Sequence, residues 1–489
     1  MAAPDPSRPP AASPAPVRGR KVIPLKPVDD GGLFSMYEAH RKVYPRAVTG
    51  TFARLRTAAV VLTQLLFYGL PWLTWNGRQA VLFDLGARKF HLFGLVLWPQ
   101  DFIYLAGLLV LAALALFFFT TVAGRLWCGY ACPQTVYTEL FMWIEHRIEG
   151  DRGARMKLDA SPWSVRKLRT KAAKHAAWAA LALFTGFTFI GYFAPVRELA
   201  AQAAALELGP WQWFWMLFYA FATWGNAGFM REQVCTYMCP YARFQGAMFD
   251  EDTMIVGYDA GRGEPRGSRP RRTDPAAVGL GSCVDCTLCV QVCPTGIDIR
   301  QGLQYECIGC AACIDVCDSV MDKMGYARGL IRYSTQRAMA EGLDRAQVLR
   351  RVARPRVLVY GALLLALALG LAGSLAVRNP LKVDVIRDRH ALARIVDAGD
   401  VENTFRLHLM NASERAQRLA VSVEGLDGIR IAGPLEFDVD AASNRAVAVS
   451  VQVPAGVGAP GSNPIRFVVR SRTDPSIARH EKAAFMVPR

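Results

Sequence analysis

The stretch GSCVDCTLCVQVCPTGIDIRQGLQYECIGCAACIDVCD, residues 281–318, decides how the rest of this 489-residue chain is interpreted. It holds eight of the twelve cysteines. Its spacing resolves into two motifs of the form Cys-x-x-Cys-x-x-Cys-x-x-x-Cys, ending in Cys293-Pro294 and in Cys317-Asp318. Two-residue gaps let three thiolates wrap one 4Fe-4S cluster, while the fourth cysteine leads to the other cluster.

The two motifs therefore predict two 4Fe-4S clusters with crossed ligands. The expected ligands of the first cluster are Cys283, Cys286, Cys289 and Cys317. Those of the second are Cys307, Cys310, Cys313 and Cys293. Two zinc sites are the alternative, but the spacing differs from that of paired Cys-x-x-Cys zinc ribbons. Asp318 replaces the proline of the bacterial pattern without removing a ligand.

Long apolar stretches lie on both sides of the cysteine segment in a chain that is 52% hydrophobic and only 20% charged. Five of them lack Asp, Glu, Lys and Arg: 57–77, 102–124, 176–196, 208–230 and 357–377. Each reaches the roughly 20 residues that a helix needs to cross the hydrocarbon core. We therefore predict a multi-domain membrane protein with five transmembrane helices. Buried helices of a soluble core are the alternative, but these usually carry a polar stripe.

Lys and Arg alternate between the segments that separate these stretches. They number 10 before the first stretch, then 3, 10, 1 and 17 in the successive loops. The positive-inside rule places the N-terminus and the segments 125–175 and 231–356, hence all twelve cysteines, on the cytoplasmic side or at that membrane face. The C-terminal tail is then outside. Because this pattern accounts for the basic excess, we expect no nucleic-acid partner.

Composition shifts divide the chain further. The expected domains are a disordered basic cytoplasmic arm 1–55, a four-helix membrane domain 56–258, a linker 259–282, a two-cluster ferredoxin-like domain 283–330, a cytoplasmic helix 331–356, a fifth transmembrane helix 357–377 and an outer domain 380–489. The outer domain contains alternating segments such as Thr404-Phe-Arg-Leu-His-Leu409. A two-residue period between turn signals predicts an all-β, immunoglobulin-like sandwich.

The outer loop around residues 81–102 is too apolar for a plain connector. We expect it at the outer membrane interface, where Arg88, Lys89 and His91 meet water. A quinone pocket there is a second option.

A second thiol pattern occurs twice. Cys128-Gly-Tyr-Ala-Cys132-Pro follows the second predicted span, and Cys235-Thr-Tyr-Met-Cys239-Pro follows the fourth. This repetition indicates an internal duplication whose four thiolates can converge. Soft thiolates at that place suit Cu(I), iron or a further iron-sulfur centre. The alternative is a pair of helix-end turns that contain buried, unreactive cysteines.

The order of these parts resembles the FixG/RdxA/CcoG family of cytochrome c oxidase accessory proteins. RKFHLFGLVLWPQDF at 88–102 and CDSVMDKMGYARGLIRYST at 317–335 carry the same resemblance. It implies a multi-pass protein of the bacterial inner membrane that reduces Cu(II) to Cu(I) during assembly of the cbb-type oxidase. The implied partners are a copper-exporting P-type ATPase and other oxidase assembly factors.

The working hypothesis is an oxidoreductase, a cupric reductase, with its catalytic thiols at Cys128, Cys132, Cys235 and Cys239. The membrane half is also similar to the NapH and NosR quinol dehydrogenases, so an electron relay fed by quinol is one alternative. A non-enzymatic assembly scaffold is another. The electron donor stays open between quinol and a cytoplasmic protein, and a homodimer stays an option.

Overall fold

The computed structural model describes residues 42–388, 393–396 and 399–488. The chain divides into two compact units, Met1–Val43 and Tyr44–Arg489, and every element below belongs to the second. Most of the predicted N-terminal arm, residues 1–41, lies outside the described residues. The predicted end of the arm at residue 55 is wrong, because helix α1 begins inside it and spans Thr51–Gly69.

A helix occurs at each of the five predicted spans. Besides α1 these are α2 (Phe102–Ala123), α6 (Val165–Ile190), α8 (Pro210–Gly225) and α15 (Pro355–Ala376). Among the described residues, two helical segments are long and apolar enough to cross a membrane, Pro99–Ala123 and Pro355–Ala376. They support a membrane protein, while five spans remain a prediction. At about 1.5 Å per residue, the 16 residues of α8 fall short of a bilayer core of about 30 Å.

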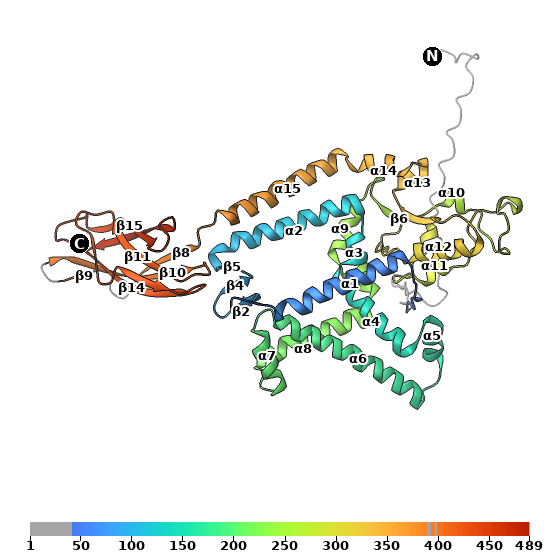
Figure 1. Ribbon diagram of the computed structural model, residues 1–489, viewed down its shortest axis with the longest axis horizontal. Helices are drawn as coiled ribbons and strands as arrows, with labels where there is room; N and C mark the ends of the chain where they lie inside the picture. The colour runs from blue at the N-terminus through green and yellow to red at the C-terminus, as the bar shows by residue number, and fades with distance from the viewer. Residues whose placement is uncertain (1–41, 389–392, 397–398, 489) are drawn as a thin grey trace, which may run out of the picture. The chain divides into compact units, whose positions relative to one another are not determined.

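Helices α2 and α15 pack side by side (Figure 1). A methyl group added at Gly107 would lie 2.5 Å from a side-chain carbon of Leu371, and one added at Gly361 would lie 3.2 Å from the ring of Phe118. These pairs run in opposite directions along the two helices, so the packing is antiparallel. Small residues at such contacts let membrane helices approach closely.

Short helices and two small sheets join the long helices. The helices are α3 (Leu126–Tyr130), α4 (Pro133–Glu149), α5 (Arg152–Ala160), α7 (Val196–Ala204) and α9 (Pro240–Met248), with π-helical turns at Asn226–Met230 and Val234–Met238. Residues 74–97 contain the strand pair β1 (Thr74–Trp75) and β2 (Arg78–Gln79), and the antiparallel sheet β3 (Val81–Asp84), β4 (Lys89–Leu92) and β5 (Leu95–Leu97). His91 is buried in that sheet, so the expectation that it meets water is wrong.

The cysteine-rich lobe is built on α11 (Leu288–Gln291), α12 (Ala312–Met324) and an antiparallel pair of strands, β6 (Ile255–Tyr258) and β7 (Ile331–Ser334). This pair corrects two predicted boundaries. Strand β6 was assigned to the membrane domain, and β7 begins the segment predicted as one helix over 331–356. The rest of that segment forms α13 (Gln336–Glu341) and α14 (Arg345–Val352), separated by Gly342 in a left-handed conformation.

The predicted linker 259–282 is packed onto this lobe. It opens with α10 (Ala260–Gly263). The Arg269 guanidinium donates to the carbonyl of Gly281 over 2.7 Å and to the hydroxyl of Tyr326 over 2.9 Å. The glycines and prolines of residues 259–282 therefore form tight turns against the lobe, and the segment is not a free linker.

The C-terminal domain is a sandwich of two antiparallel sheets. One sheet has the order β12-β14-β10-β8, with β9 added beside β10, and the other has the order β13-β11-β15-β16. The strands are β8 (Leu381–Arg387), β9 (Arg394–Ile395), β10 (Val401–Asn411), β11 (Gln417–Glu424), β12 (Arg430–Ala432), β13 (Glu436–Val439), β14 (Asn444–Val453), β15 (Gly461–Ser471) and β16 (Ala478–Val487).

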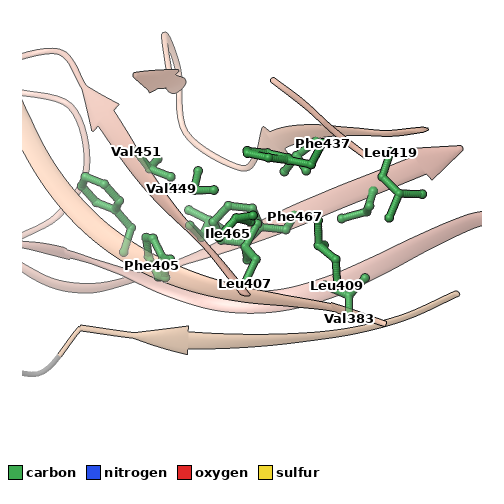
Figure 2. Packing of buried hydrophobic residues seen from close by; sticks show 14 of the residues in the cluster. Val383, Phe405, Leu407, Leu409, Leu419, Phe437, Val449, Val451, Ile465 and Phe467 are labelled. Atoms are coloured by element: carbon green, nitrogen blue, oxygen red, sulfur yellow. The ribbon is translucent and has the colours of Figure 1, made fainter. Parts of the chain in front are cut away.

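Side chains of both sheets interlock in its core (Figure 2). Phe405 of β10 meets Phe467 of β15 edge to face, with ring centroids 5.1 Å apart. Inward positions alternate with outward ones, as in an immunoglobulin-like fold. The predicted all-β domain is confirmed.

Candidate functional site

Two cavities open inside the cysteine-rich lobe. The first is lined by Cys283, Cys286, Cys289 and Cys317. The second is lined by Cys293, Cys307, Cys310 and Cys313, with Cys289 in the wall shared by both. The structure thus brings together each of the two predicted sets of four cysteines. The ligand assignment itself stays a prediction.

Both cysteine motifs have the same unusual backbone conformation. Asp285 and Gly309, each just before the second cysteine of its motif, have φ values of 51° and 69°. Thr287 and Ala311, each just after that cysteine, have φ values of 55° and 58°. A left-handed conformation costs a non-glycine residue roughly 1–3 kcal/mol, so it persists where the surrounding structure requires it. Here it turns successive backbone N–H groups to one side, which forms a concave site for an anion.

The residues that line the cavities fit iron-sulfur clusters. The N–H of Gly309 donates to the sulfur of Cys307, and the N–H of Ala312 donates to that of Cys310. Burial raises the pKa of Cys307 and of Cys317 to about 12. Thiols so far from water become thiolates most readily on binding a cationic metal centre, and the N–H donors then stabilise the sulfur charge. Within the described ranges, no group of three or more His, Cys, Asp or Glu is arranged to hold a single metal ion.

The two Cys-x-Tyr-x-Cys-Pro motifs share one local design. A residue with a positive φ ends the preceding helix, Gly124 (φ 55°) before the first motif and Arg231 (φ 36°) before the second. The first cysteine then lies in a short helical turn, which is α3 in one motif and the π-helical turn Val234–Met238 in the other. The second cysteine is the N-cap of α4 or α9, each of which begins with proline. This common design supports the predicted internal duplication.

The structure brings the four cysteines of these motifs, the membrane-edge thiols, close to one another. Burial raises the pKa of Cys128 to about 11, and the neighbouring Cys132 and Cys239 raise it further. Burial raises the pKa of Cys235 to about 12, with Cys132, Cys128 and Cys239 acting in the same direction. Cys128 and Cys235 also pack on the apolar cluster that contains Ile308.

The membrane-edge thiols also adjoin the second cavity. A methyl group added at Gly129 would lie 3.0 Å from the Cα and N atoms of Cys310. One added at Gly309 would lie 3.3 Å from the carbonyl oxygen of Arg125. The first Cys-x-Tyr-x-Cys-Pro motif and the second ferredoxin motif therefore meet backbone to backbone.

Two buried arginines flank this contact. The Arg56 guanidinium donates to the carbonyl of Cys310 over 3.1 Å, and the Arg125 guanidinium donates to that of Ala242 over 2.7 Å. The positive charge of Arg125 lowers the pKa of Cys128, Cys235 and Cys307 and so opposes the larger effect of burial. Sequence reasoning did not single out Arg56, because it lies 254 positions from its partner and no local pattern marks it.

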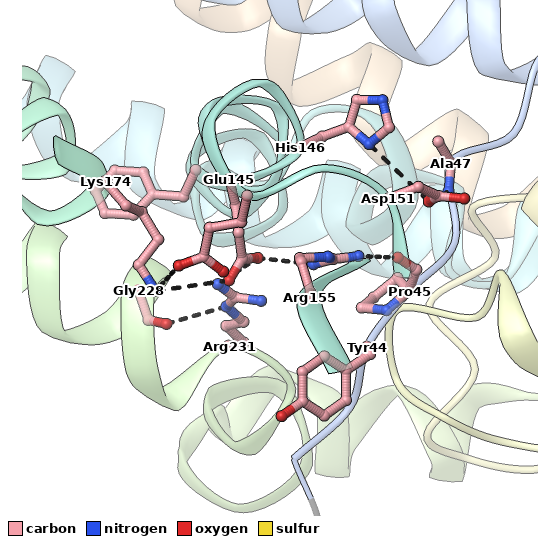
Figure 3. A network of polar contacts seen from close by, with 12 residues as sticks. Tyr44, Pro45, Ala47, Glu145, His146, Asp151, Arg155, Lys174, Gly228 and Arg231 are labelled. Carbon is pink, nitrogen blue, oxygen red and sulfur yellow. Dashed lines mark hydrogen bonds and ion pairs between the residues drawn. The ribbon is translucent and has the colours of Figure 1, made fainter. Parts of the chain in front are cut away.

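A buried charge network holds the second motif in place (Figure 3). The Glu145 carboxylate of α4 lies 2.8 Å from Arg155 of α5, 3.1 Å from Arg231 and 3.9 Å from Lys174 of α6. Burial acts to raise the pKa of Glu145, but the three cations together lower it. The turn before Cys235 is thereby tied to three helices.

The fold and this site define a membrane iron-sulfur protein with a ferredoxin-type lobe and an immunoglobulin-like domain. Residues 230–336 match the 4Fe-4S dicluster domain family, and residues 105–153 match a 4Fe-4S binding domain family. Residues 371–488 match the family described as the IG-like fold at the C-terminal of FixG. The two iron-sulfur matches each include one Cys-x-Tyr-x-Cys-Pro motif.

The chain is 40% identical over 436 residues to the nitrogen fixation protein FixG of Rhizobium meliloti, covering 82% of this chain and 83% of that protein. It is 38% identical over 451 residues to protein RdxA of Cereibacter sphaeroides, covering 90% and 94%. The crystal structure of a FixG-related protein from Vibrio parahaemolyticus covers 22% of this chain and 97% of that chain, at 23% identity and a TM-score of 0.21. This chain belongs to the FixG/RdxA/CcoG family and is an iron-sulfur electron-transfer protein.

Proposed function

We propose that this chain is a cupric reductase that supports assembly of cbb-type cytochrome c oxidase. Its eight ferredoxin cysteines would hold two 4Fe-4S clusters, which supply one-electron oxidoreduction. Cu(II) is the substrate and is reduced at Cys128, Cys132, Cys235 and Cys239, where each electron converts one Cu(II) to Cu(I). The observation that carries the proposal is the approach of Gly129 to the backbone of Cys310, which brings these thiols beside the second cavity.

The surroundings of the thiols suit this reaction. Soft sulfur ligands favour Cu(I) over Cu(II), so binding at the four thiols stabilises the product. The buried Arg125 offsets negative charge on the cysteines. Cys128 is also held by a 3.5 Å contact to the side-chain oxygen of the fully buried Gln245.

We further propose a five-span topology, with the N-terminus, the clusters and the membrane-edge thiols on the cytoplasmic side of the bacterial inner membrane. The distribution of Lys and Arg between the segments supports this orientation. Cu(I) released on that side is available to a copper-exporting P-type ATPase. The immunoglobulin-like domain lies in the periplasm and binds other assembly factors.

The test uses the full-length chain, purified without oxygen, reduced with dithionite and freed of excess reductant. Cu(II) is added with a chromophoric Cu(I) chelator. The double variant Cys128→Ser, Cys235→Ser is expected to keep about eight irons per chain and to lose copper reduction. A wild-type rate in this variant would refute the proposal. If the wild-type chain holds both clusters but does not reduce copper, the alternative of a non-enzymatic assembly scaffold is favoured.

A further inference from the structure

A third cavity lies against the second cluster cavity. Its volume is about 200 Å³, and it is lined by residues of α1, α4 and the cysteine-rich lobe and by residues 45–48. Pro294 and Ala312 line both this cavity and the one formed by Cys293, Cys307, Cys310 and Cys313. The two cavities therefore share part of their wall.

Part of the lining of this third cavity is polar. Glu139 and His146 of α4 line it together with Arg56. Glu139 forms an ion pair with Arg56, whose Nε lies 2.8 Å from Oε1 of the carboxylate. The His146 ring nitrogen Nδ1 lies 3.9 Å from Asp151, and both side chains are partly exposed (Figure 3). The Glu139 carboxylate and the His146 imidazole can accept protons from a bound molecule, and the partly exposed pair of His146 and Asp151 can pass them to solvent.

The cavity adjoins an apolar groove along α1. Ala53 and Thr57 line both the cavity and the groove. Beyond them the groove continues over Val61, Leu62 and Leu65, all of which are exposed. In the proposed topology this face of α1 is in contact with lipid, so a lipid-soluble molecule can enter from the bilayer.

We infer that the third cavity and the groove bind a membrane quinol, with its ring between Glu139 and His146 and its isoprenoid tail along α1. Oxidation breaks both O–H bonds of the quinol and yields quinone, two protons and two electrons. Glu139 and His146 accept the two protons, and the two 4Fe-4S clusters that the eight ferredoxin cysteines would hold would each take up one electron. This inference identifies the electron donor as a quinol. It rests on the proposed function for the later transfer of the electrons to Cu(II).

A nicotinamide dinucleotide fits the same cavity less well. Its phosphates need unpaired cations, but the three arginines that line the cavity are each paired with a carboxylate. Arg56 is paired with Glu139, Arg46 with Asp151 and Arg155 with Glu145. The apolar groove, in contrast, suits a tail that has no charge.

Binding is tested with the fluorescent quinol analogue 2-heptyl-4-hydroxyquinoline N-oxide, titrated against the full-length chain in lipid nanodiscs. Quenching is expected to saturate with the wild type. Thr57→Trp, which fills the junction between cavity and groove, is expected to weaken binding about tenfold or more. The matched control is Leu55→Trp, also exposed on α1 but outside both linings, and it should bind like the wild type. If Thr57→Trp lacks iron, Ala58→Trp in the groove replaces it.

Electron entry is tested by adding decylubiquinol without oxygen and recording the low-temperature paramagnetic signals of reduced clusters. His146→Gln is expected to be reduced more slowly by quinol than the wild type, whereas dithionite should reduce both proteins fully. Unchanged analogue binding in Thr57→Trp, or reduction by NADH and not by quinol, would overturn the inference. If dithionite-reduced protein reduces copper but the chain binds no quinol, the inference fails and the proposed function stands. If quinol reduces the clusters but copper is not reduced, the inference stands and the proposed function fails.

Discussion

The backbone N–H of Ala53 donates to Oδ2 of Asp315 over 2.7 Å, and that of Phe52 donates to Oδ1 over 3.2 Å. Gly50, the N-cap of α1, has no side chain to cap the helix, and a methyl group there would lie 2.3 Å from the Asp315 carboxyl carbon. A carboxylate of α12, located between two cluster cysteines, therefore caps the first long helix. Such a carboxylate satisfies orphan N–H groups and complements the helix dipole.

Asp315→Ala should weaken the attachment of the cysteine-rich lobe to α1. The stabilising free energy of this contact should fall by about 1–2 kcal/mol, as expected for loss of a helix cap. Hydrogen exchange of the first turn of α1 should become correspondingly faster, while the lobe keeps its iron. Asp322→Ala, on the same helix but with an exposed ion pair to Arg328, is the control and should change nothing measurable. Equal exchange in both variants would show that the cap does not hold the lobe.

Gly129→Ala should separate the membrane-edge thiols from the second cavity, because the added methyl group meets the Cys310 backbone. We expect normal iron content and a copper reduction rate lowered about tenfold or more, since sub-ångström displacements at a reacting centre are costly. The measurement is the anaerobic chelator assay on dithionite-reduced protein. Gly225→Ala in α8, where a methyl group meets nothing within 4 Å, should keep the wild-type rate. A normal rate in Gly129→Ala would contradict a role for this contact.

Cys317→Ser and Cys283→Ser should remove the same cluster although the two residues belong to different sequence motifs. Both line the first cavity. Each variant should fall from about eight to about four irons per chain and lose one of two paramagnetic signals. Cys293→Ser should lose the other signal. If Cys317→Ser and Cys307→Ser instead lost the same signal, the crossed assignment would be wrong.

His91 should make the stability of the sheet formed by β3, β4 and β5 sensitive to acid. Burial, together with the charges of Arg78 and Lys89, lowers its pKa to about 4, although Asp84 and Glu414 act in the opposite direction. Because the folded pKa lies below the unfolded value of about 6.5, the unfolded chain binds the proton first. The stability contribution of neutral His91 is therefore complete above about pH 6.5 and is lost as the pH falls towards 4.

The measurement for His91 is the Tm of wild type and His91→Gln at pH 7 and pH 5 in one detergent. The wild type should lose more of its Tm on acidification than the variant, which has no imidazole to protonate. Equal losses would show that another group governs the acid response.

Short-range sequence patterns predicted much of this protein. The two-residue cysteine gaps indicated two clusters with crossed ligands, because three thiolates on one short loop can face only one cluster. Alternation such as that of residues 404–409 predicted strands of a half-buried sheet, and the repeated Cys-x-Tyr-x-Cys-Pro motif indicated four converging thiols. Each of these signals depends on residues within a few positions of one another.

Contacts between distant segments were not predicted from the sequence. Strand β6 finds its partner β7 more than 70 positions away, Arg56 reaches Cys310 across 254 positions, and Asp315 caps a helix 262 positions earlier. The sequence by itself determined which residues are suited to hold clusters and which helices are apolar enough for lipid. Only the tertiary structure decided that the second cluster cavity meets the membrane-edge thiols on one side and a third cavity on the other. Periodicity and spacing report which face of a segment is buried, but they carry no information about the segment that buries it.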